Sequence, residues 1–125
     1  MALHEYETNV REMVRIARND LLHRDNSGVG MGLVVWLSTT PVDDHRHNVV
    51  YKQSWRRYNA DVKLYNESAA RVMASEGVPI IDLHSFTAEC LGTAAGRDHG
   101  HMREDASAAQ GAYIARRILD LVPSC

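Results

Sequence analysis

Residues 32–41 read GLVVWLSTTP, and this stretch decides the fold class. The run Gly32–Ser38 is apolar almost to its end and contains β-branched residues, which is typical of a strand buried on both faces of a parallel sheet. Pro41 follows it, and a proline cannot donate a hydrogen bond to a sheet ladder. A second run, Val78–Leu83, reads VPIIDL and has its proline near the start, where the missing N–H is tolerated. We therefore predict two parallel strands.

Segments with helical periodicity lie before, between and after the two apolar runs. Apolar residues recur at three- and four-residue steps in His4–His23, Trp55–Glu76 and Ala106–Leu121, which predicts three amphipathic helices, and a short helix is predicted at Ser85–Leu91. Gly77 is placed to cap the second helix in a left-handed conformation. This order of elements predicts an α/β fold with a parallel sheet and right-handed crossovers. Two strands bury too little surface for stability, so we expect further strands from a partner or from an upstream part of the sheet.

The composition is that of an ordinary globular protein. The chain has 125 residues, of which 45% are hydrophobic and 24% charged, with a formal net charge of −2. These values predict a single domain over residues 1–125. Acidic residues accompany every basic cluster, so we expect no nucleic-acid partner. No apolar run is long enough for a secretory signal or a membrane span, so we expect no membrane partner and a cytoplasmic location.

The chain also contains two cysteines and one long polar segment. Cys90 and Cys125 form no spacing motif, so we predict a free, buried Cys90 and a frayed Cys125. Residues 42–54 are polar, and we predict an exposed, irregular loop.

A pair of residues with catalytic chemistry lies between the last strand and the last helix. Asp98 and His101 fall in a glycine-containing loop on the side where open α/β sheets place ligands, beyond the carboxyl ends of the strands. At a three-residue offset the carboxylate can accept from one imidazole nitrogen, which leaves the other free to take a proton from a hydroxyl nucleophile. The same spacing also occurs in solvated loops that have no role. His99 is an alternative base, but only His101 has this offset from Asp98.

Five segments of the chain, taken in order, resemble the SGNH (GDSL-type) hydrolases. They are EYETNVR at 5–11, VVWLSTTP at 34–41, YNESA at 65–69, VPIIDL at 78–83, and Asp98-x-x-His101. The resemblance implies a three-layer α/β/α, flavodoxin-like fold around about five parallel strands. It also implies hydrolysis of small carboxylic esters by a serine, with Asp98 and His101 as the catalytic acid–base residues and with no metal or cofactor.

The sequence departs from the family pattern at the nucleophile. The family's serine and the glycine and asparagine of its oxyanion hole precede the helix with which this chain begins, so they have no counterpart here. The stretch between His101 and Gly111 is also longer than in the family. None of the serines lies in a Gly-Asp-Ser context, and each is interpreted as a turn, helix-surface or loop residue: Ser27, Ser38, Ser54, Ser68, Ser75, Ser85, Ser107 and Ser124. The resemblance therefore implies an N-terminally truncated esterase that is incomplete or inactive.

Two other functions stay open. One is a non-catalytic binding or oligomerisation module, in which the strand at 33–38 exposes an edge that another copy of the chain covers. The other is a metal-binding protein, because histidine and carboxylate side chains bind zinc or nickel. The candidate ligands lie on two separate loops and have no motif spacing: Asp43, Asp44, His45 and His47 on the first, and Asp98, His99 and His101 on the second.

Overall fold

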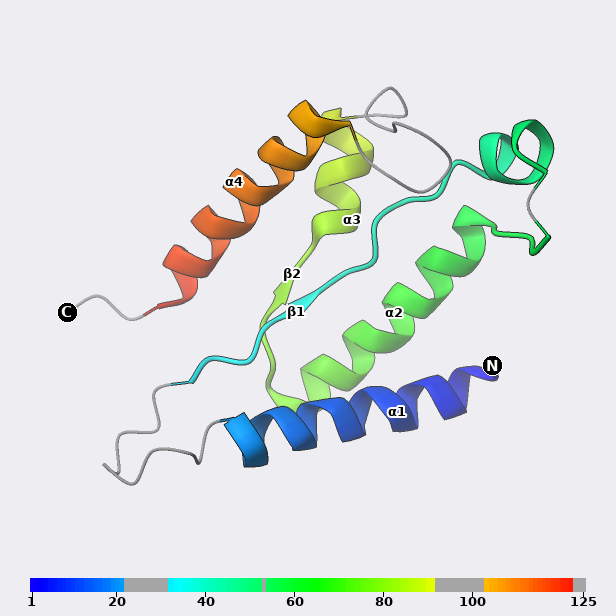
Figure 1. The fold of residues 1–125 in the computed structure, drawn as a ribbon. Helices are drawn as coiled ribbons and strands as arrows, with labels where there is room; N and C mark the ends of the chain where they lie inside the picture. The colour runs from blue at the N-terminus through cyan, green and yellow to red at the C-terminus, as the bar shows by residue number, and fades with distance from the viewer. Residues whose placement is uncertain (22–31, 53, 92–102, 123–125) are drawn as a thin grey trace.

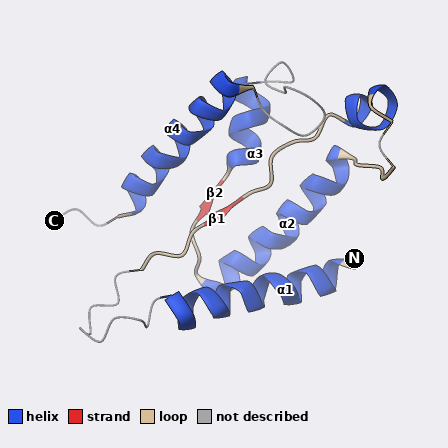
Figure 2. Cartoon of the chain, viewed as in Figure 1, coloured by secondary structure: helices blue, strands red, loops and turns tan. Residues whose placement is uncertain are grey.

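The computed structural model describes residues 1–21, 32–52, 54–91 and 103–122. These residues are mostly helical and contain a small parallel sheet (Figures 1 and 2). The elements are α1 (Leu3–Ile16), the π-helical turn η1 (Ala17–Leu21), β1 (Trp36–Leu37), the π-helical turn η2 (Arg46–Val50), α2 (Asn59–Glu76), β2 (Ile80–Ile81), α3 (Leu83–Phe86), the π-helical turn η3 (Thr87–Leu91) and α4 (Glu104–Leu121). The predicted mixture of helices and parallel strands is confirmed at this level.

The two strands pair in parallel. Trp36 lies opposite Ile80 and Leu37 opposite Ile81, and the Ser38 N–H donates to the Ile81 carbonyl at 3.2 Å. Both strands are shorter than predicted: in the described ranges the ladder pairs Trp36–Leu37 with Ile80–Ile81. The predicted burial on both faces is wrong for β1 in this part of the chain, since Leu37 is 43% exposed.

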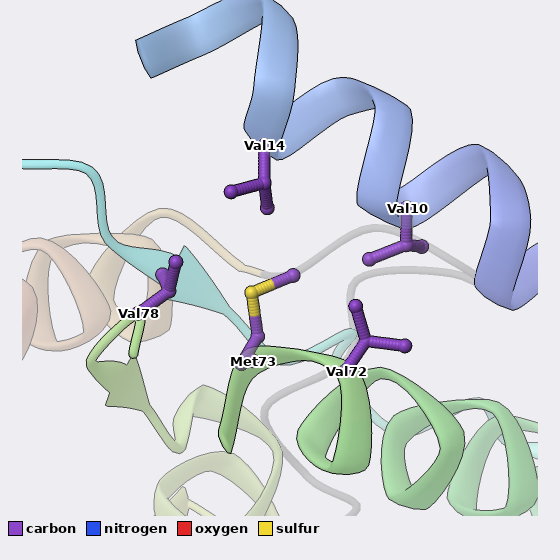
Figure 3. Close-up of a cluster of buried hydrophobic side chains, with 5 residues drawn as sticks. All are labelled: Val10, Val14, Val72, Met73 and Val78. Atoms are coloured by element: carbon purple, nitrogen blue, oxygen red, sulfur yellow. The ribbon is translucent and has the colours of Figure 1, made fainter. Parts of the chain in front are cut away.

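One face of the sheet is covered by α1 and α2. Their contact buries Val10 and Val14 of α1 against Val72 and Met73 of α2, with Val78 closing the cluster ahead of β2 (Figure 3). Trp36 and Ile80 pack against this cluster from the strands. The strands lie between this helix pair and α4 in the view of Figure 1. The predicted stripes of α1 and α2 therefore supply this core, although Met13 of α1 is 57% exposed, and the predicted buried side of α4 is not confirmed at Ile118, which is 40% exposed.

Several helix starts differ from the prediction. α2 begins at Asn59 instead of Trp55, because Tyr58 is extended, with φ −130° and ψ 133°. α3 begins at Leu83 instead of Ser85, because the Asp82 side chain caps it by accepting from the Ser85 N–H. α4 begins two residues earlier than predicted, at Glu104.

Residues 42–52 are more ordered than predicted. The expectation of an exposed, irregular loop is wrong here, because residues 46–50 form a helical turn in which His47 is 0% and Asn48 7% exposed. The Asn48 amide donates to the Arg57 carbonyl at 2.6 Å, and its oxygen accepts from the Arg57 N–H at 2.9 Å. His47 Nε2 lies 3.0 Å from the Trp55 carbonyl oxygen. These contacts with backbone groups several residues away satisfy the buried polar side chains.

Gly77 ends α2 in the predicted left-handed conformation, with φ 67°. A Cβ at this position would meet no atom of the described residues within 4 Å, so the cost of a side chain is conformational and not steric. We expect Gly77→Ala to lower the free energy of unfolding by about 1 kcal/mol. Gly111 lies inside α4 and also has open space, so Gly111→Ala is expected to raise it by about 0.5–1 kcal/mol. Urea denaturation measures both, and changes of the same sign would contradict the assignment.

None of the helices in these ranges combines the length and the apolarity needed to cross a membrane.

Candidate functional site at the carboxyl ends of the strands

The predicted catalytic residues Asp98 and His101, together with the alternative His99, lie outside the described residues. The elements on either side of residues 92–102 are described. Gln110 of α4 donates from Nε2 to the Thr87 hydroxyl at 2.9 Å, and this hydroxyl donates to the Leu83 carbonyl at 2.7 Å. Phe86 stacks on Tyr113 with ring centroids 4.2 Å apart. The first half of α4 is therefore fixed against α3 and η3, at the carboxyl end of β2.

A polar cluster joins the ends of the two strands. Ser38 follows β1, and Asp82 follows β2. The Ser38 hydroxyl donates to Asp82 Oδ1 at 3.1 Å and accepts from the His84 N–H at 2.9 Å. Ser38 is only 8% exposed, so its interpretation as a turn, helix-surface or loop serine missed its role. It is a buried link between β1 and the start of α3.

Asp82 holds the cluster together. Its carboxylate accepts from the Ser85 N–H at 3.0 Å and from the Ser85 hydroxyl at 2.7 Å, in addition to Ser38. Partial burial raises the pKa of Asp82, but the hydrogen bonds from Ser85 and Ser38, together with the nearby His84, outweigh this effect and lower it. Asp82 is therefore an anionic cap of α3.

His84 lies in the first turn of α3. It is 9% exposed, and its Nε2 is buried without a hydrogen-bond partner among the described residues. Serine, aspartate and histidine thus meet here, but no hydrogen bond joins the imidazole to the Ser38 hydroxyl in the part of the chain that the structure describes. Because the hydroxyl proton is directed to the Asp82 carboxylate and not to the imidazole, this arrangement joins the strand ends and is not the serine–histidine pair of a triad.

A pocket of about 660 Å³ opens beside this cluster, between α2 and the α3–η3 segment. Trp36 and Ile80 contribute from the strands, and Ala70 and Ala88 from the helical segments on either side. Its polar lining residues include Lys63, Asn66 and Glu67 of α2, Asp82, His84 and Ser85 at the start of α3, and Glu89 of η3. The volume is that of a site for a small organic ligand.

The described acidic, histidine and cysteine side chains bear on the metal-binding alternative and on the prediction for Cys90. Over the described ranges, no group of three or more His, Cys, Asp or Glu side chains is arranged to hold a metal ion. Asp43 and Asp44 instead accept backbone N–H groups, from Arg46 at 3.0 Å and from Asn59 at 2.6 Å. Cys90, which lies in η3, is exposed, so the prediction that it is buried is wrong.

No protein-family model matches the chain, and no curated protein or solved structure shows significant similarity to it.

Proposed function

We propose that this chain carries the acid–base half of an SGNH-type serine esterase, with His101 as the general base and Asp98 as the residue that orients it. The observation that supports this proposal is the polar carboxyl edge of the sheet. Ser38 and Asp82 directly follow the two strands and are hydrogen-bonded to each other at this edge. The buried Thr87–Gln110 hydrogen bond joins the two elements that flank residues 92–102. Parallel α/β sheets carry catalytic groups on the loops that follow this edge.

The proposed fold is a three-layer α/β/α domain whose sheet continues beyond β1. Three features favour it. The helices α1 and α2 share one face of the sheet. Leu37 of β1 and Leu33 just before this strand are half exposed, as expected where a further strand would cover them. Isolated two-stranded sheets are at best marginally stable.

The proposed reaction is hydrolysis of a small carboxylic ester. The serine nucleophile and the oxyanion-hole donors belong to a segment with no counterpart within residues 1–125. His101 takes the proton of that serine as it attacks the ester carbonyl, and then gives the proton to the departing alkoxide. Asp98 holds the imidazole in the tautomer that this transfer requires. Residues 1–125 thus supply the histidine that carries the proton, and the serine that it would activate has no counterpart among them.

The test measures whether the Asp98 carboxylate changes the NMR titration of His101 in the chain itself. A carboxylate that accepts from an imidazole stabilises the imidazolium form. Asp98→Asn should therefore shift the NMR titration of His101 to lower pH while that of His99 moves less, and Asp105→Asn is a control with the same change in charge. An unchanged His101 titration in Asp98→Asn would remove the basis of the proposed pairing.

A covalent probe tests the absence of a nucleophile. The purified chain is treated with a fluorophosphonate, and its intact mass is measured alongside hydrolysis of a chromogenic acetate. We expect no adduct and the same slow hydrolysis in His101→Ala as in the wild type. A stoichiometric adduct with hydrolysis that depends on His101 would show that one of the serines of this chain acts as the nucleophile.

The exposed side chains next to β1 also favour the second candidate, a non-catalytic oligomerisation module. A stable symmetric dimer in analytical ultracentrifugation, combined with an unchanged His101 titration in Asp98→Asn, would favour this function over the esterase.

A further inference from the structure

The pocket between α2 and α3–η3 has an excess of negative charge. Its charged side chains are Lys63, Glu67, Asp82 and Glu89, so three carboxylates face one ammonium group. In the described ranges, neither Lys63, Glu67 nor Glu89 forms an ion pair or a side-chain hydrogen bond. A concave site lined mainly by one sign of charge concentrates ligands of the opposite sign.

The remaining lining includes apolar surface and a buried imidazole. Trp36 and Ile80 provide apolar surface, and Trp36 adds an aromatic ring that can interact with a cation. His84 lines the same pocket and is about nine-tenths buried; its Nε2 is shielded and has no hydrogen-bond partner among the described residues.

The Asn66 amide does not compete for such a ligand. It donates to the Thr39 carbonyl and accepts from the Thr39 N–H, both at 2.9 Å, so its polar atoms already have partners. Within the ranges that the structure describes, Lys63 is therefore the only unpaired cationic group among the lining residues, and Glu67 and Glu89 are two unpaired carboxylates. This balance disfavours an anionic ligand.

We propose that this pocket binds a small organic cation, a primary ammonium carried on an apolar body. The ammonium lies between Glu67 and Glu89, and the apolar body packs on Trp36 and Ile80. This inference goes beyond the esterase proposal, because Asp98 and His101 have no part in it and neither experiment depends on the outcome of the other.

The test compares three probes of similar shape by NMR titration of the ¹⁵N-labelled chain: 2-phenylethylammonium, 2-phenylethanol and 3-phenylpropanoate. We expect the ammonium to bind with a dissociation constant on the order of 1 mM, which suits a ligand with so few heavy atoms. The alcohol should bind about fivefold more weakly, because it lacks the charge. Shifts should concentrate at Trp36, Ala70 and Ala88. Equal affinity for the alcohol, or stronger binding of the anion, would overturn the proposal.

Variants of the exposed carboxylates locate the ammonium. Glu67→Gln and Glu89→Gln should each weaken binding of 2-phenylethylammonium about two- to fivefold, the range for one exposed ion pair. Both substitutions are at exposed positions, so the fold should survive them. Glu104→Gln, which makes the same change on α4 away from the pocket, should leave binding unaltered. If all three variants bind like the wild type, the cation does not lie at this pocket and the proposal fails.

Discussion

Replacing Met73 by alanine is expected to lower the free energy of unfolding by about 2–5 kcal/mol, the range for truncating a large buried apolar side chain. Met73 is 0% exposed and lies between Val14, Val72 and Val78 at the contact of α1 with α2 (Figure 3). The packed helices on both sides cannot close fully over the cavity that the truncation leaves. Because small domains are stable by only a few kcal/mol, this variant should be largely unfolded under mild conditions.

Urea denaturation followed by far-UV circular dichroism measures this effect. Met13→Ala is the matched control, because Met13 carries the same side chain on α1 but is 57% exposed. Its free energy of unfolding should change by less than about 0.5 kcal/mol. Similar losses in the two variants would mean that the α1–α2 contact is not the main core, and that the helices are held by contacts elsewhere in the chain.

Local patterns predicted the helices better than their ends. The apolar stripe of α2 and the cap at Gly77 depend on residues close in sequence, and both were found where expected. The start of α2 was misplaced because a distant residue defines it. The Asn59 N–H donates to the Asp44 side chain at 2.6 Å, across 15 positions, and no helical periodicity carries that information.

The strands show a different limit. Their direction and pairing followed from the apolar runs, but their length did not. The ladder in the described residues is confined to Trp36–Leu37 and Ile80–Ile81. Leu33 and Leu37 are exposed there, although their sequence predicts a buried strand. The sequence is thus typical of a wider sheet than these two strands form.

The candidate site was predicted only in part. Asp98 and His101 lie outside the described residues, so their pairing remains a prediction. The Ser38–Asp82 link, which joins residues 44 positions apart, was missed although a signal for it existed. Ser38 is the first polar residue after one apolar run and Asp82 the first after the other. In a parallel pair with this register, such residues come to lie side by side.

The Ser38–Asp82 hydrogen bond is the basis of the second prediction. Asp82→Asn is expected to lower the free energy of unfolding by about 1–2 kcal/mol at pH 7. Asparagine keeps the size of the side chain and one acceptor oxygen. It loses the charge that strengthens the hydrogen bonds from Ser38 and from the Ser85 hydroxyl and N–H. The connection between β1 and the start of α3 should weaken without leaving a cavity.

The loss should depend on pH in a defined direction. The pKa of Asp82 is lowered in the folded protein, so its contribution is fully present above the pKa of the unfolded chain, which is about 4. That contribution disappears as the pH falls through the lowered pKa of the folded state. The difference in stability between the wild type and Asp82→Asn should therefore be largest near pH 7 and shrink below about pH 4.

Urea denaturation of both proteins at pH 7 and near pH 3 tests this expectation. Some acid sensitivity should persist in Asp82→Asn, because hydrogen bonds from Ser68 and Arg71 also lower the pKa of Glu7. Asp61→Asn makes the same substitution at an exposed position of α2. If the stability difference between Asp61→Asn and the wild type shrank to the same extent, the pH dependence would come from the net charge of the chain. A decrease found for Asp82→Asn and not for Asp61→Asn would assign the pH dependence to the carboxylate that joins the ends of the two strands.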